Sequence, residues 1–67
     1  MCQMSVFLAR AGEEELVLEN ASLLEVKEDG ISVSTLFEAP RLIPDARVQT
    51  IDFLNGKVIL VKAGEEK

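Results

Sequence analysis

Two dipeptides, Asp29-Gly30 and Asn55-Gly56, each stand between short segments in which apolar and polar residues alternate. Such pairs are typical of two-residue β-hairpin loops of type I′, because both central residues of that turn need a positive φ. Alternation with a period of two is the pattern of a half-buried strand. The two dipeptides therefore predict two antiparallel hairpins, and they constrain the fold more than any other feature of the sequence.

Turn residues divide the rest of the chain into further segments, so that six strands are predicted in all. The predicted strands cover residues 3–9, 16–19, 24–27, 31–37, 47–54 and 57–62. Ala11-Gly12 and the three glutamates at 13–15 are interpreted as a charged turn. A helix over residues 13–28 is the alternative, since leucine and glutamate favour helices. Strands are preferred because Asn20 interrupts that helix and the apolar residues after it fit a period of two.

Two irregular features are expected in the second half of the chain. Val48 has the opposite parity to Ile51 and Phe53, which predicts a β-bulge near Gln49-Thr50. Residues 38–45 contain two prolines and are interpreted as a connection, because proline cannot donate a hydrogen bond within a central strand.

Short strands at regular spacing within 67 residues predict an all-β fold. The fold class expected is a small antiparallel SH3-like barrel of about five to six short strands. Residues 1–67 are expected to form this one domain, with residues 63–67 as a frayed tail. A domain of this size buries only about 60% of its extended surface. It therefore needs a well-formed core, a metal or a partner subunit.

Composition excludes several classes of function. The chain contains no histidine, so catalysis by imidazole and metal binding by imidazole are ruled out, and no nucleotide-binding loop is present. We therefore predict that the protein is not an enzyme. The formal charge of −5 opposes binding to a phosphate backbone, which needs clustered cations. No apolar run or basic leader suggests a membrane or secretion, so a cytoplasmic protein is expected.

Other charged residues are interpreted as structural. Consecutive glutamates on a strand point alternately to opposite faces, so those at 13–15 cannot converge on one cation. Asp52 stands between Ile51 and Phe53 and is expected to face the other side of its strand or to accept a cation such as Arg47 or Lys57. Arg41 and Arg47 flank the proline-containing connection, and in a chain of net charge −5 they give only a weak anion site.

Cys2 is the candidate metal ligand. Aminopeptidases remove Met1 when the second side chain is small, and this would leave a free α-amine and a thiol on one residue. The pKa of an α-amine is about 7.7–8.0 and that of a thiol about 8.5, so a metal can displace both protons near neutral pH. Nitrogen with sulfur suits Ni(II) or Cu(II). One residue supplies two donors, so a second chain, or a backbone amide with another donor, must complete the site. A terminal cysteine without any role is the alternative.

The chain as a whole resembles the CooT family. The resemblance is carried by Met1-Cys2-Gln3-Met4-Ser5-Val6, by Asp29-Gly30-Ile31 with Thr35-Leu36-Phe37-Glu38, and by residues 43–60, and it spans Met1 to about Val61. Members are small bacterial and archaeal proteins that were earlier catalogued as predicted RNA-binding proteins. The best-studied member is a nickel-binding accessory protein in the maturation of carbon monoxide dehydrogenase.

The resemblance implies a homodimer that binds one Ni(II) per two chains, with Cys2 as the metal residue. It also implies a nickel-enzyme client such as carbon monoxide dehydrogenase. Met4, Val6 and Phe7 are expected beside the two-fold axis. Two alternatives belong to other classes: a small RNA-binding barrel and a protein-interaction adaptor. The negative charge and the lack of paired aromatic residues on one strand oppose RNA binding, because bases stack on such pairs.

Overall fold

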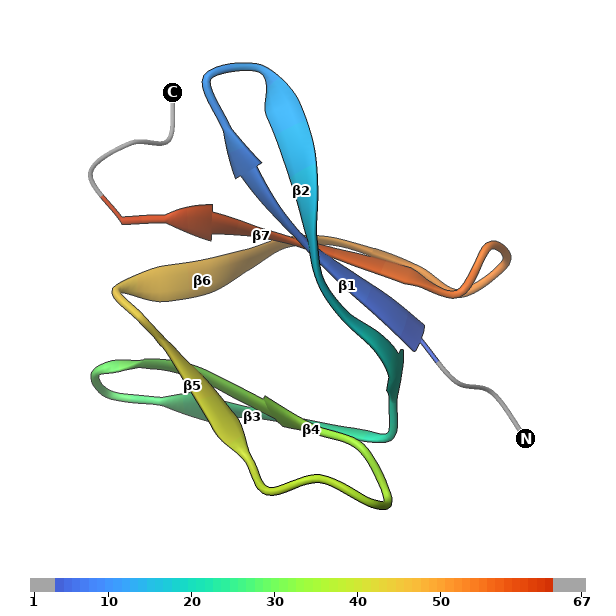
Figure 1. The fold of residues 1–67 in the computed structure, drawn as a ribbon. Coiled ribbons are helices and arrows are strands. Elements are labelled where there is room, and N and C mark those ends of the chain that lie inside the picture. The colour runs from blue at the N-terminus through green and yellow to red at the C-terminus, as the bar shows by residue number, and fades with distance from the viewer. Residues whose placement is uncertain (1–3, 64–67) are drawn as a thin grey trace.

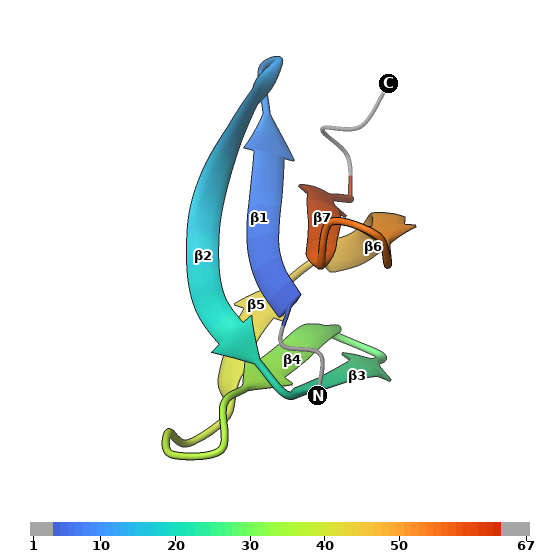
Figure 2. The same ribbon diagram turned by 90° about the vertical axis from the view of Figure 1, so that its right-hand side faces the viewer.

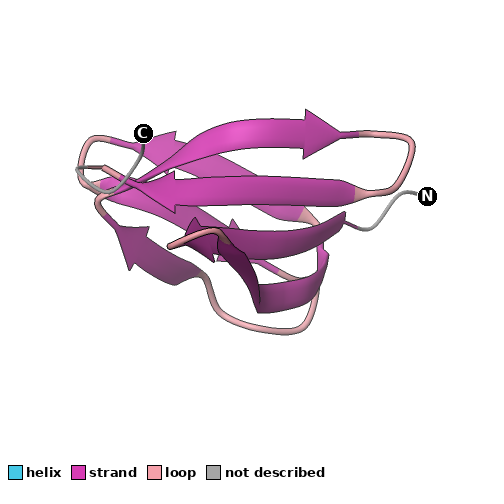
Figure 3. Cartoon of the chain, turned by 90° about the horizontal axis from the view of Figure 1, so that it is seen from above, coloured by secondary structure: helices cyan, strands magenta, loops and turns pink. Residues whose placement is uncertain are grey.

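The computed structural model describes residues 4–63 of the chain. Within these residues the chain forms strands and no helix, which confirms the predicted all-β class (Figure 3). The strands are β1 (Met4–Arg10), β2 (Glu13–Ala21), β3 (Leu23–Lys27), β4 (Gly30–Ser34), β5 (Arg41–Pro44), β6 (Ala46–Asp52) and β7 (Lys57–Lys62). No helix of the described residues could therefore cross a membrane.

The strands form two small sheets that pack against each other (Figures 1 and 2). The four-stranded sheet has the order β2-β1-β7-β6, and the three-stranded sheet below it in Figure 1 has the order β3-β4-β5. β1 and β7 pair in parallel, and every other described pair is antiparallel. The fold is thus barrel-like, with one strand more than expected and a parallel pair that joins the two ends of the chain.

Two sharp corners carry the chain from one sheet to the other. Ser22 alone separates β2 from β3, and Asp45 alone separates β5 from β6. Asn20 has a φ of 62° and Asp45 a φ of 58°, in the left-handed region that Asn and Asp tolerate better than most residues. The Ser22 amide donates to Ser34 O at 2.9 Å, and the Asp45 amide donates to Asp29 O at 2.9 Å. These bonds hold both corners against the three-stranded sheet.

The loop between β1 and β2 has two consecutive positive φ angles, although the sequence predicts only a charged turn there. Ala11 and Gly12 have φ of 50° and 81° and form the two-residue loop between β1 and β2. The glutamates at 13–15 belong to β2 and not to a turn. The period-two interpretation is therefore confirmed over the helical one, and β2 is longer than predicted because the loop closes in two residues.

The two predicted hairpins exist, but their loops differ from the type I′ expectation. Lys27 pairs with Gly30, so Glu28 and Asp29 form the loop between β3 and β4, and neither has a positive φ. Asp52 pairs with Lys57, so the loop between β6 and β7 has four residues. The type I′ assignment is wrong because strand pairing, and not the dipeptide, decides which residues occupy the loop.

The proline-containing segment was interpreted as a connection, but part of it is strand β5. Arg41–Pro44 pairs with β4 at the edge of the three-stranded sheet. Proline is tolerated in an edge strand because one side of that strand makes no ladder hydrogen bonds. The predicted bulge in β6 is confirmed, since the register shifts between Val48 and Thr50.

The core lies between the two sheets. Its residues come from six strands and are Val6, Leu8, Ala21, Ile31, Val33, Ile43, Ala46, Val58 and Leu60. Ile31, Val33 and Leu60 are fully buried. Burial of a branched side chain of this size contributes about 1.5–3 kcal/mol. Residues 31 and 33 share a face, as the alternation predicted, but Ser32 and Ser34 are buried too because β4 is the central strand of its sheet.

Candidate functional site

Cys2, the predicted metal residue, lies outside the described residues. The fold does fix the place where the described chain begins, at Met4 of β1. Met4 pairs with Ala21 at the end of β2, and the Ser5 amide donates to Gly56 O at 2.8 Å. The start of β1 is therefore held between the corner after β2 and the loop between β6 and β7.

The loop beside the start of β1 is organised by Asp52. Its Oδ1 accepts hydrogen bonds from the backbone N–H groups of Leu54 and Asn55, both at 3.1 Å, and its Oδ2 accepts from Asn55 Nδ2 at 2.8 Å. The Asn55 side-chain bond, followed by the backbone bonds, stabilises the carboxylate and lowers the pKa of Asp52 below its ordinary value of 3.8. Asp52 thus accepts hydrogen bonds within its own loop and closes the turn.

This turn exposes two large apolar side chains. Phe53 is 81% exposed and Leu54 is 94% exposed. The strands predicted over residues 31–37 and 47–54 include Phe37 and Phe53, but both stand in loops, and Phe37 is 93% exposed. Asp52, followed three residues later by Asn55-Gly56, is the sequence signal for a turn that ends the strand before Phe53. Asp and Asn side chains accept hydrogen bonds from backbone amides two or three residues on.

A small apolar hollow of about 110 Å³ adjoins the start of β1. It is lined by Met4, Val6, Ala21, Ser22, Leu23, Leu24 and Val58. Leu23 at its border is 52% exposed, whereas Val6 is only 1% exposed and belongs to the core. Val6 therefore has almost no surface to offer a second subunit. Exposed apolar groups of the described residues near the start of β1 include Leu23 and the tip formed by Phe53 and Leu54.

Several of the other charged residues have structural partners. Glu14 forms an ion pair with Lys57, with Nζ and Oε1 2.9 Å apart, and the Lys57 ammonium lies 4.9 Å from the centre of the Phe7 ring. Arg41 donates to Val17 O at 3.0 Å and so links β5 to β2 across the two sheets. Within residues 4–63, no three acidic side chains gather closely enough to hold a metal ion.

The comparisons identify the family. A family model described as CO dehydrogenase accessory protein CooT matches residues 1–61. The chain belongs to the CooT family. This confirms the resemblance seen in the sequence, and the matched range contains Cys2 and all of β1 to β6. CooT proteins are accessory proteins, which agrees with the prediction of a protein that is not an enzyme.

A solved structure shares the CooT fold of this chain. It is the crystal structure assigned to CooT from Carboxydothermus hydrogenoformans, with a TM-score of 0.81 and 24% sequence identity. The alignment covers 91% of this chain and 97% of the other. The similarity shows that the two-sheet architecture is common to both chains. No curated protein matches the chain.

Proposed function

We propose that this CooT-family protein is a nickel-binding accessory protein, in which Cys2 of two chains holds one Ni(II) ion. The observation that carries the proposal is the family match over residues 1–61, because it includes Met1-Cys2 and names an accessory protein of CO dehydrogenase. The client is then a nickel-containing carbon monoxide dehydrogenase, and nickel is cargo. The protein acts in the cytoplasm, where its single cysteine stays reduced.

The donor set of the chain suits this role. Cys2 is the only cysteine, and the sequence has no histidine, so the thiolate is the one soft side-chain donor apart from the methionine thioethers. After removal of Met1, the α-amine of Cys2 is a second donor on the same residue. Two chains supply two thiolates and two amines, whereas a single chain supplies half of that set. The metal site and the homodimer therefore depend on each other.

The surface around the start of β1 supports a dimer contact there. Only Gln3 separates Cys2 from Met4 in the sequence, so two Cα–Cα steps limit the distance between these residues to about 7 Å. The apolar tip of Phe53 and Leu54 belongs to the loop that hydrogen-bonds Ser5, and Leu23 borders the adjoining hollow. Contact between two copies would cover these exposed apolar groups near the metal donors. It would also stabilise a domain whose own core is small.

A nickel titration tests the proposal. We expect one Ni(II) per two chains for the processed protein, with an absorption band from thiolate-to-nickel charge transfer. The near-ultraviolet background is low because the chain contains neither Trp nor Tyr. Affinity should fall as the pH drops below about 7, because protons compete for the amine and the thiolate.

Two variants separate the donors. Cys2→Ser should lose tight nickel binding and keep the far-ultraviolet circular dichroism of the folded chain, because Cys2 precedes β1. A chain with two extra residues before Cys2 keeps the thiol but moves the α-amine, and it should bind nickel much more weakly. Sedimentation of each protein, with and without nickel, reports the dimer. Equal nickel affinity in wild type and Cys2→Ser would refute the proposal.

A further inference from the structure

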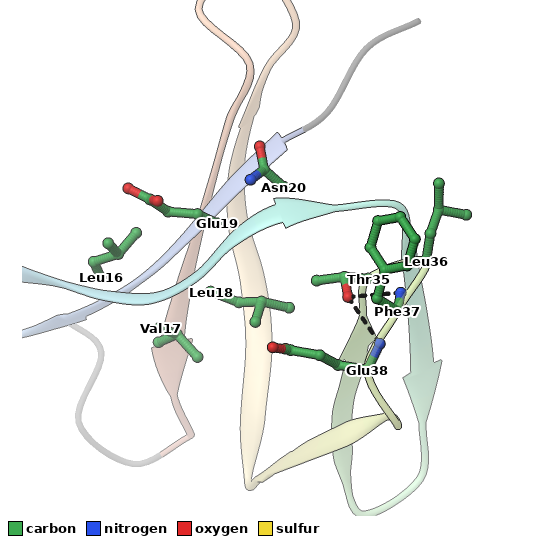
Figure 4. Close-up of a pocket in the computed structure, with 9 residues that line it drawn as sticks. All are labelled: Leu16, Val17, Leu18, Glu19, Asn20, Thr35, Leu36, Phe37 and Glu38. Carbon is green, nitrogen blue, oxygen red and sulfur yellow. Dashed lines mark hydrogen bonds between the residues drawn. The ribbon is translucent and has the colours of Figure 1, made fainter.

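A groove runs between the second half of β2 and the loop that follows β4 (Figure 4). It is formed by residues 16–20 and residues 35–38 and has a volume of about 510 Å³. We call it the β2 groove. β2 is an outer strand of its sheet, so the groove lies along a sheet edge that no other described strand covers. The groove shares no lining residue with the hollow beside the start of β1, although Asn20 precedes Ala21, which pairs with Met4, and the metal proposal does not use it.

The loop that borders the β2 groove is shaped by a side-chain hydrogen bond. Thr35 Oγ1 accepts from the backbone amides of Phe37 at 3.1 Å and Glu38 at 3.0 Å, as Figure 4 shows. The resulting turn leaves Leu36 68% exposed and Phe37 93% exposed. Single exposed apolar residues are common on protein surfaces, but a large adjacent pair beside a groove is characteristic of interaction sites.

The charges of the β2 groove indicate what kind of partner fits. The charged residues that line it are Glu19 and Glu38, and Arg41 of β5 reaches the edge of β2 there, where it donates to Val17 O. The carboxylate of Glu38 extends from the loop toward β2 in Figure 4. Two copies docked through this groove would bring these carboxylates together. Like charges across an interface disfavour association, so a second copy is a poor occupant.

We propose that the β2 groove docks a basic segment of the client protein, in which a Lys or Arg lies next to an apolar side chain. The apolar side chain would contact Leu36 and Phe37, and the cation would pair with Glu19 or Glu38. An extended segment suits a groove along an outer strand, since its side chains alternate between the groove and solvent. This inference rests on the proposed accessory function, which requires a client protein.

A pair of synthetic peptides tests the chemistry directly. One is a capped peptide of alternating lysine and leucine, and the other has glutamate in place of lysine. Each is titrated into the ¹⁵N-labelled full chain, and amide chemical shifts are followed. We expect the lysine peptide to shift the amides of residues 16–20 and 35–38, and the glutamate peptide to leave them unchanged. Shifts outside the groove, or equal shifts with both peptides, would overturn the proposal.

Matched variants assign the effect to the groove. Phe37→Ser should weaken lysine-peptide binding at least about fivefold, because it removes the apolar contact. Glu38→Gln should weaken it about twofold to fivefold, as expected for one exposed ion pair. The controls are Val26→Ser, which alters a side chain 74% exposed on β3, and Glu25→Gln on the same strand. Controls that weaken binding as much as the groove variants would also overturn it.

The same proteins distinguish docking from metal binding. Phe37→Ser should bind nickel like wild type, and Cys2→Ser should bind the lysine peptide like wild type. If the wild-type protein binds the lysine peptide but not nickel, the metal site alone is refuted. Intact nickel binding without peptide binding would refute the docking site alone. A dimer that dissociates in Phe37→Ser would identify a second copy as the occupant and would refute the proposed client segment.

Discussion

Replacement of Gly30 by alanine tests how closely β4 and β5 approach. Gly30 begins β4 and pairs with Pro44, and its φ of 154° lies where L side chains are strained. A Cβ at this position would overlap the carbonyl oxygen of Ile43 and lie 2.9 Å from Pro44 Cα. Both neighbours are backbone atoms of the adjacent strand. The overlap therefore cannot be relieved by rotation of a side chain.

The expected loss of stability follows from two contributions. Backbone strain at an unfavourable φ costs about 1–3 kcal/mol. Overpacking against a fixed neighbour costs about 1–3 kcal/mol more. A chain of this length has a free energy of unfolding of about 3–10 kcal/mol. We therefore expect Gly30→Ala to lose about 2–6 kcal/mol of this stability, and its Tm to fall by at least about 8 °C, given roughly 4–8 °C per kcal/mol.

Gly12→Ala is the matched control. Gly12 also has a positive φ, at 81°, but no atom lies within 4 Å of the position its Cβ would take. Only the strain remains, which costs about 1–2 kcal/mol. Thermal and urea unfolding followed by circular dichroism, at one protein concentration, measure both variants. If the two substitutions cost the same free energy, the close approach of Gly30 to β5 does not constrain the fold and the reasoning is wrong.

Two further predictions concern the surface. Asn55→Ala should raise the pKa of Asp52 toward its ordinary value of 3.8, as measured by carboxyl ¹³C shifts, and an unchanged pKa would contradict the assigned hydrogen bonds. Because folding lowers this pKa, these bonds stabilise the turn above pH 3.8 and are lost as the pH falls through the folded-state pKa. We also expect no binding to single-stranded RNA at physiological salt, because the net charge is −5. Micromolar, salt-sensitive binding in fluorescence anisotropy would contradict this.

The sequence alone identifies the candidate metal residue but not its surroundings. Cys2 is identified by its residue type and position, and by the family resemblance that residues 1–61 bear out. Its surroundings could not be predicted. The proximity of Ser5 to Gly56 depends on the pairing of β1 with β7, which joins residues about fifty positions apart. Short-range patterns carry no information on such pairs.

The exposed phenylalanines also show that a short-range pattern does not decide burial. Phe37 and Phe53 follow strands whose apolar residues do enter the core, so extension of the alternation includes them in the predicted strands as well. In the structure each strand ends first, because Thr35 and Asp52 accept hydrogen bonds from the next amides and turn the chain. Whether an apolar residue is buried thus depended on one polar side chain before it.

The sequence by itself determined the segments that form β1 to β4, β6 and β7, the parity of the core residues on them, and the bulge between Val48 and Thr50. These properties follow from a period of two along the chain, which is a local quantity. Tertiary structure alone decided that β1 and β7 pair in parallel, that Arg41–Pro44 becomes an edge strand, and that Asn20 and Asp45 bend the chain between sheets. Each of these depends on which distant backbone is free to accept a hydrogen bond. An alternating pattern shows that a strand will bury one face, but the strand beside it is chosen by the packing of the whole core.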